Sequence, residues 1–107
     1  QGATSGLVTE SGEVFTGAST NAGGPGVATN STVQEALDSV EEGARSTVHG
    51  CCGEINAMSK AANAGAKLKG STVATVRAVG RQAGKLMEPC ASCRAVAEKL
   101  GVKIVQP

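Results

Sequence analysis

Two short stretches decide how this sequence is interpreted: HGCCGE at residues 49–54 and EPCASC at residues 88–93. Cys90 and Cys93 form a C-x-x-C pair, a spacing typical of zinc binding or redox chemistry, whereas disulfide frameworks usually spread their cysteines along the chain. Cys51 and Cys52 are adjacent, so both cannot easily serve one framework. The four cysteines therefore predict a metal site with one cysteine spare.

Each stretch lies where a helix is expected to begin. Free backbone N–H groups and the positive end of a helix favour the thiolate, which is the form of cysteine that binds metal. Cys90 and Cys93 would present their sulfurs on one side of a single turn. Together with Cys52 they supply three ligands and leave a fourth position open, as in catalytic zinc sites. With His49 or Cys51 as a fourth ligand, the site would instead be closed and structural.

Glu54, two residues after Cys52, favours catalysis. A carboxylate in that place can lie beside a water on the metal without ligating the metal itself. Redox chemistry of the thioredoxin kind needs no such Cys-x-Glu partner, and its C-x-x-C pair should follow an early strand.

The rest of the chain predicts an α/β sandwich. Strands are expected at residues 3–9 and 13–18, joined into a hairpin by the turn at 10–12. A helix with a capping box at Ser31 and Gln34 should then carry an apolar stripe from Val33 to Ala44. The later elements are expected as a helix at about 52–64, a β-branched strand at 72–79 covered on both faces, a helix at 90–100 and a strand at 102–106. The sheet should be small and mixed, with the helices packed on it.

Composition and charge narrow the function. A mean hydropathy of −0.03 and the absence of a long apolar run exclude a membrane span. Residues 1–44 carry six acidic side chains and no Lys or Arg, whereas residues 45–107 carry all ten Lys and Arg against three Glu, for a net charge of +1. This asymmetry indicates an anionic partner for the second half, although alternating charged faces would explain it equally well.

The pattern C-x-E followed by P-C-x-x-C matches the zinc-deaminase signature. On Cys52-Gly53-Glu54 and the PCASC of residues 89–93, the sequence resembles the cytidine-deaminase-like superfamily. EPC at 88–90 also resembles the opening of the second motif in tRNA adenosine deaminases. Residues 49–62, with the short strand and PCASC that follow, are most similar to the YwqJ-like deaminases, which occur as C-terminal toxin domains of bacterial polymorphic toxins. Many superfamily members continue past the fourth strand with another helix and strand, and this sequence stops at Pro107.

The resemblance implies a three-layer-type cytidine-deaminase-like fold and zinc-dependent hydrolytic deamination of a nucleobase. Zn²⁺ would be held by Cys52, Cys90 and Cys93, and Glu54 would carry the protons. Cytosine is favoured over adenine because the toxin-type relatives act mostly on cytosine.

Substrate contacts are expected at four positions: Ser19, Asn21, His49 and Arg94. A plain turn would explain the first two at least equally well, and His49 would also serve as a helix cap or spare ligand. Arg94 is also expected to soften the negative charge of three thiolates. If the substrate is DNA or RNA, its path should be lined by cations from this set: Arg45, Lys67, Lys69, Arg77, Arg81, Lys85 and Arg94. Within it, Arg81 and Lys85 lie in the loop that leads to the second cysteine motif.

At the level of the whole protein, residues 1–107 are expected to form a single minimal deaminase domain, the C-terminal toxin domain of a longer protein. A bacterial toxin-delivery system would secrete it, it would act in the target-cell cytoplasm, and a cognate immunity protein would bind it. Two other classes are open: a salvage deaminase for free nucleosides or nucleotides, and a structural-zinc interaction module in which Glu54 is dispensable.

Overall fold

The computed structural model describes residues 3–20, 26–46, 49–50, 52–78, 80–81 and 83–105. In chain order its elements are β1 (Ala3–Val8), β2 (Val14–Ala18), α1 (Ser31–Asp38), a short 3-10 helix (Glu42–Ala44), α2 (Gly53–Asn63), β3 (Thr72–Arg77), α3 (Ala91–Leu100) and β4 (Lys103–Ile104). The predicted order of hairpin, helix, helix, strand, helix and strand is confirmed. None of the helices in these ranges has the length and apolar character needed to cross a membrane.

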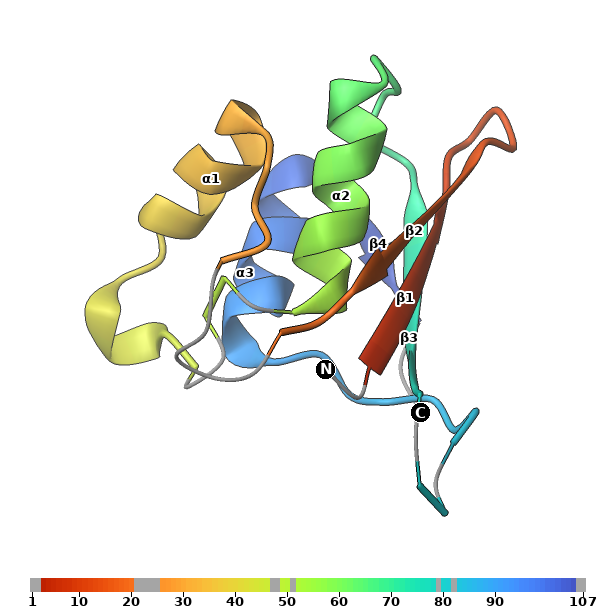
Figure 1. Cartoon of the computed structure of the whole chain (residues 1–107). Coiled ribbons are helices and arrows are strands. Elements are labelled where there is room, and N and C mark those ends of the chain that lie inside the picture. The colour runs from red at the N-terminus through yellow and green to blue at the C-terminus, as the bar shows by residue number, and fades with distance from the viewer. Residues whose placement is uncertain are drawn as a thin grey trace.

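The four strands form one mixed sheet in the order β2-β1-β3-β4 (Figure 1). β1 is antiparallel to both β2 and β3, and β3 runs parallel to β4. Leu7 of β1 lies opposite Phe15 on one side and Val73 on the other, so apolar side chains from three strands meet on one face. The small mixed sheet of the predicted fold is therefore present.

The helices cover that face in two layers (Figure 1). α2 packs directly on β1 and β2, α3 lies next to β4, and α1 is outermost and contacts both other helices. A single aliphatic core joins them, and Leu7, Leu37, Ile55, Met58 and Val96 are among its fully buried members. The order of layers is thus the sheet, then α2 and α3, then α1.

The second face of β3 differs from the sequence prediction. Thr72, Ala74 and Val76 point away from the helices and are only half-buried, whereas Val73 and Thr75 on the helix side are buried. The expectation that this strand is covered on both faces is wrong for the described residues, because no helix or strand there packs on the second face.

The prediction that α1 continues to Ala44 is also wrong. α1 ends at Asp38, and Arg45 donates from Nε to the Val40 carbonyl at 2.9 Å and from Nη2 to the Asp38 carbonyl at 3.2 Å. A longer helix would have given these carbonyls to later backbone N–H groups. Val40 still reaches the core, but from the turn after the helix, and Ala44 is exposed.

The start of α1 is set by Asn30 and not by the predicted capping box. The Asn30 side chain accepts the N–H groups of Thr32 at 2.9 Å and Val33 at 3.3 Å. Ser31 is therefore the first helical residue. Gln34 does not reach back to the cap, because its amide donates forward to Asp38 at 2.9 Å.

Two glycines let α2 approach the sheet closely. A Cβ on Gly17 of β2 would collide with the backbone of Gly53 and Ala57 in α2, and one on Gly53 would lie 2.7 Å from the Ser5 hydroxyl. The first turn of α2 therefore rests almost directly on β1 and β2. This contact places the start of α2, with Cys52 and Glu54, over the sheet.

Candidate metal centre

Cys52 and Cys90 occupy equivalent positions at the starts of two helices. Each is an N-cap residue with extended backbone, Cys52 before α2 and Cys90 before α3. The Cys90 sulfur accepts the backbone N–H of Cys93 at 3.4 Å, as a capping side chain does. Cys93 lies in the first turn of α3 and is fully buried. The two helices thus bring three sulfurs to one place.

The sulfurs lie close enough to share one ion. Sγ of Cys90 is 3.1 Å from Sγ of Cys52 and 3.2 Å from Sγ of Cys93. All three sulfurs lie within 4.8 Å of one another. Tetrahedral zinc with bonds of about 2.3 Å to sulfur separates its sulfurs by roughly 3.8 Å, so a small rotation of these side chains would seat the ion. The donor set therefore fits zinc.

The fourth position is the point at which a catalytic and a structural site differ. Among the described residues, no imidazole or carboxylate joins the group of three sulfurs. His49 is therefore not part of it, and Cys51, the other candidate for a closed site, lies outside the described residues. Among the described residues, the site therefore has three ligands and an open fourth position.

The three sulfurs share hydrogen bonds that favour the thiolate form of Cys90. Hydrogen bonds with Cys52 and Cys93 lower the pKa of Cys90 to about 2. The hydrogen bond with Cys90 raises the pKa of Cys52, hydrogen bonds with Cys52 and then Cys90 raise the pKa of Cys93, and burial adds to both increases. Binding of a divalent cation would remove the remaining protons, so metal affinity at this site should rise with pH.

Glu54 is buried beside the sulfurs but is not one of their group. It lies in the first turn of α2 and is 4% exposed. Burial raises the pKa of this carboxyl, and negative charge on Cys90 raises it further, while a hydrogen bond with the Thr75 side chain opposes the increase. A carboxyl whose pKa is raised holds a proton more readily than a free carboxyl does, which suits it to giving and taking protons. The location and the pKa direction both suit proton transfer.

Two buried hydroxyls beneath Glu54 were missed by the sequence analysis. Thr75 of β3 is hydrogen-bonded to Ser5 of β1, and both side chains are buried. Thr75 therefore connects the carboxyl of Glu54 to the sheet. The sequence did contain a signal for Thr75, because it lies two residues after Val73 and therefore on the same, buried face of the strand. The signal is easily overlooked, since Thr and Val are both β-branched and similar in shape.

His49 is hydrogen-bonded to Ser92, a residue that the sequence analysis did not single out. Nδ1 of His49 lies 2.7 Å from the hydroxyl of Ser92, which also accepts the backbone N–H of Ser46 at 3.1 Å. Ser92 is fully buried between Cys90 and Cys93 in the sequence. Burial lowers the pKa of His49, and the positive charge of Arg45 lowers it further. The imidazole thus ties the segment before α2 to the first turn of α3.

The other predicted contact residues lie as follows. The Ser19 hydroxyl accepts the N–H of Ala3 at 3.2 Å, and the Ser19 N–H donates to the Ala3 carbonyl at 3.1 Å, so this residue closes the end of the hairpin. Asn21 lies outside the described residues. Arg94 is exposed on α3, and its Nε donates to the Pro89 carbonyl at 3.4 Å. A role for these residues in binding substrate stays a prediction.

Comparison with known proteins adds one finding to this geometry. The model of a protein family described as YwqJ-like deaminase matches residues 1–102, which include both cysteine motifs and the strands β1, β2 and β3. No curated protein and no solved structure matches the chain.

Proposed function

Because the chain belongs to the YwqJ-like deaminase family, we propose that it is a zinc-dependent enzyme that hydrolytically removes the amino group of a nucleobase, with cytosine in DNA or RNA as its substrate. The observation that carries the proposal is the cluster of Cys52, Cys90 and Cys93, with the buried carboxyl of Glu54 next to it. Glu54 is not itself a member of the cluster. A purely structural site would have no use for a buried acid next to three thiolates, because that acid costs free energy of folding.

The three cysteines would hold Zn²⁺, which when bound supplies a Lewis acid that activates water near neutral pH. Glu54 takes a proton from the attacking water and gives it to the ring nitrogen beside the attacked carbon. It then passes the second proton to the departing ammonia. Thr75 and Ser5 keep the carboxyl oriented during both transfers, and the buried setting excludes competing solvent.

The choice of cytosine rests on the resemblance to toxin-type deaminases. The proposal that the domain binds a single base, and not a stack of bases, is supported by its aromatic content. Phe15 is the one aromatic residue of the chain, and it is half-buried against the core from β2. It offers no platform on which successive bases of a strand would stack. A single base in a pocket is the recognition mode that fits such a surface.

The wider role follows from the same resemblance. The domain would be the toxic part of a bacterial polymorphic toxin, delivered by a secretion system and active in the cytoplasm of the target cell. A cognate immunity protein would protect the producing cell by binding the domain.

The test is to sequence nucleic acid from cells that express the domain, beside cells that express Glu54→Ala. Cytosine-to-thymine changes in DNA, or their equivalent in RNA, should appear only with the intact protein. Purified protein should be assayed in parallel on free cytidine. Conversion of cytidine, with no change in either polymer, would favour the salvage deaminase. Zinc-loaded protein that deaminates none of the three would contradict the proposal.

A further inference from the structure

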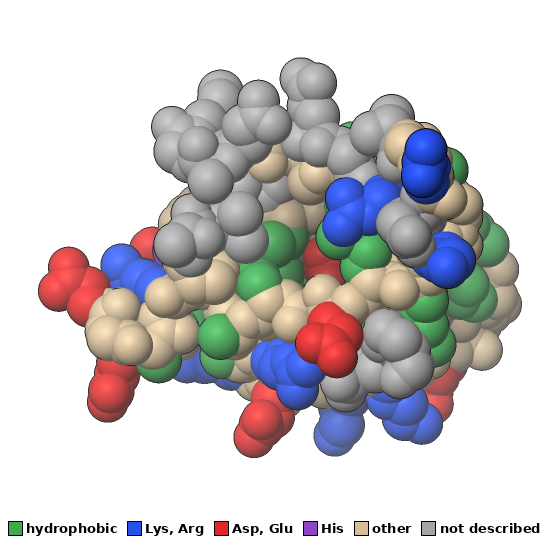
Figure 2. Space-filling model, turned by 90° about the horizontal axis from the view of Figure 1, so that it is seen from below, with side chains coloured by type: hydrophobic (Ala, Val, Ile, Leu, Met, Phe, Trp, Pro, Cys, Tyr) green, Lys and Arg blue, Asp and Glu red, His purple; other side chains and the backbone are tan. Residues whose placement is uncertain are grey.

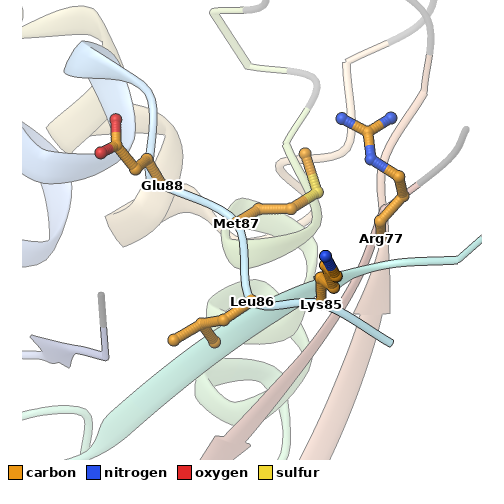
Figure 3. A pocket seen from close by; sticks show the side chains of 5 residues that line it. All are labelled: Arg77, Lys85, Leu86, Met87 and Glu88. Atoms are coloured by element: carbon orange, nitrogen blue, oxygen red, sulfur yellow. The ribbon is translucent and has the colours of Figure 1, made fainter. Parts of the chain in front are cut away.

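A pocket of about 380 Å³ lies beside the second cysteine motif and is lined by Arg77, Lys85, Leu86, Met87 and Glu88 (Figure 3). It is formed where the end of β3 meets the segment that leads into Pro89 and Cys90. The face seen from below in Figure 2 also has a hollow, with Lys or Arg side chains at one edge and an acidic side chain at its floor. None of the site chemistry described above uses this pocket.

Backbone pairing determines which way its side chains point. The Arg77 N–H donates to the Lys85 carbonyl at 3.0 Å, and the Met87 N–H donates to the Thr75 carbonyl at 2.8 Å. Val76 and Leu86 form an antiparallel bridge between these two bonds. Arg77 therefore faces Lys85, and Met87 faces Thr75.

Side chains alternate between the faces of a sheet, so these four residues share one face and the Val76–Leu86 pair has the other. Thr75 is the residue that contacts Glu54. Arg77 is two residues beyond Thr75 on β3, and Lys85 lies opposite Arg77. Both are thus on the face of the sheet that carries the metal centre. Figure 3 agrees, because the Met87 side chain points toward Arg77 and Leu86 points to the opposite side.

Arg77 and Lys85 are both exposed, and no side chain among the described residues pairs with either of them. In the ranges that the structure describes, neither Arg77 nor Lys85 makes a side-chain ion pair or hydrogen bond. The Glu88 carboxylate lines the same pocket but points away from both cations (Figure 3). Like charges placed directly opposite each other on a sheet are destabilising. An anion bridging them would convert this cost into two charge-assisted hydrogen bonds.

We propose that Arg77 and Lys85 form a phosphate-binding subsite for the substrate whose base is deaminated at the metal centre. This inference rests on the proposed function and deepens it. With the base beside Glu54, the sugar and phosphate of the same or a neighbouring nucleotide extend outward along β3 to the two cations. Arg81, which the sequence suggested as the companion of Lys85, does not line the pocket, and Arg77 takes its place.

The test uses the Glu54→Gln protein loaded with zinc, so that ligands bind without being consumed. Into it are introduced Arg77→Gln and Lys85→Gln, singly and together. The matched control is Lys60→Gln with Lys99→Gln, two exposed lysines in the last turns of α2 and α3, at the helix ends away from the cysteines. The control removes the same charge from the same chain.

Three ligands are compared by direct binding: cytidine, cytidine 5′-monophosphate and a short single-stranded oligonucleotide containing one cytosine. Each pocket variant should weaken phosphate-bearing ligands by about tenfold or more and leave cytidine unchanged. Binding of the oligonucleotide should also lose about 0.7 of log–log salt slope for each cation removed. Preference for the monophosphate would identify a free nucleotide as the source of the phosphate, and preference for the oligonucleotide would identify a polymer.

The inference is wrong if the pocket double variant binds all three ligands as the control does, or if cytidine binds as tightly as the phosphate-bearing ligands. Failure of the proposed function has a different signature. In that case wild-type protein loaded with zinc would deaminate no cytosine substrate, while the effect of the pocket variants on binding of inorganic phosphate would still be measurable. Deamination with an unaffected salt slope would refute only the subsite.

Discussion

Glu54 is buried, so its negative charge is costly and its pKa is raised. Replacement by Gln keeps the shape and the hydrogen bond to Thr75 but removes the ability to exchange a proton. We expect Glu54→Gln to keep one zinc per chain and to lose activity by roughly 10²–10⁴-fold, the usual contribution of a general acid–base residue. Metal analysis and initial rates of deamination measure the two quantities.

Glu98→Gln, an exposed position on α3, is the control for this substitution and should change neither quantity. A folded Glu54→Gln protein that has lost its zinc would make Glu54 a ligand. The assignment of its role in proton transfer would then have to be abandoned.

The chain contains one histidine, so the titration of His49 can be followed without ambiguity. Its pKa should lie below the usual 6.5, chiefly through burial and partly through Arg45. Replacing Arg45 by Gln should therefore raise the pKa of His49, measured by NMR at a fixed metal content. Arg81→Gln, on an exposed loop residue that does not contribute to this shift, should leave it unchanged.

The same shift has a defined sign for stability. A histidine whose pKa is lowered by folding is neutral more readily in the folded state than in the unfolded state. Its contribution is present above about pH 6.5 and is lost as pH falls through the lowered value in the folded protein. Thermal unfolding across this window should show a smaller loss of stability for His49→Gln than for the wild type. An equal loss in both would contradict the assignment of the shift to His49.

At the residue scale, spacing was sufficient to predict that Cys52, Cys90 and Cys93 lie together, with Glu54 beside them. Cys52, Glu54, Cys90 and Cys93 are recognisable because two helix starts impose fixed intervals on them. The residues that hold them were not recognisable. Thr75 and Ser92 act through contacts with partners far away in the sequence, and no interval records such contacts.

The contact between β2 and α2 is the element-level feature that positions Glu54. Gly17→Ala would place a methyl group against the backbone of Gly53 and Ala57, which cannot move aside as a side chain does. We expect a loss of about 1–3 kcal/mol in unfolding free energy, measured by urea denaturation, together with reduced activity. Gly6→Ala in the adjacent strand β1 is the control, because nothing lies within 4 Å of its new Cβ. Equal stability of the two variants would rule out a tight β2–α2 contact.

Element boundaries show where local sequence signals compete. Asn30 and Ser31 are both good caps, and only the observed hydrogen bonds decide between them. The apolar stripe predicted to end at Ala44 was correct in burying Val40 but wrong in keeping it helical, because α1 ends at Asp38 and the Arg45 side chain donates to the carbonyls of Asp38 and Val40 instead. The presence of strands in these segments, by contrast, was predictable, because β-branched runs and the turn at residues 10–12 leave few alternatives.

For the molecule as a whole, the metal centre would act as a link between α2 and α3. Cys90→Ala should lose zinc and unfold at a lower temperature, because an aliphatic core of this size gains stability from metal binding. Treatment of the wild type with a chelator should lower its unfolding temperature in the same direction. Cys51→Ala is expected to keep its zinc, as the spare cysteine. Full zinc occupancy in Cys90→Ala would show that Cys90 is not a zinc ligand and would contradict the proposed site.

The wide separation of the sulfurs along the chain has a consequence for biosynthesis. One sulfur comes from position 52 and the other two from positions 90 and 93, on a helix that precedes only the last strand. A ribosome makes the chain from its N-terminus, so Cys52 is made well before the other two sulfurs of the cluster exist. The hairpin and α2 can therefore form on the nascent chain before the cluster of three sulfurs can assemble. Under the proposed function, activity cannot appear until Cys90 and Cys93 have been made and α3 has docked on the rest of the domain.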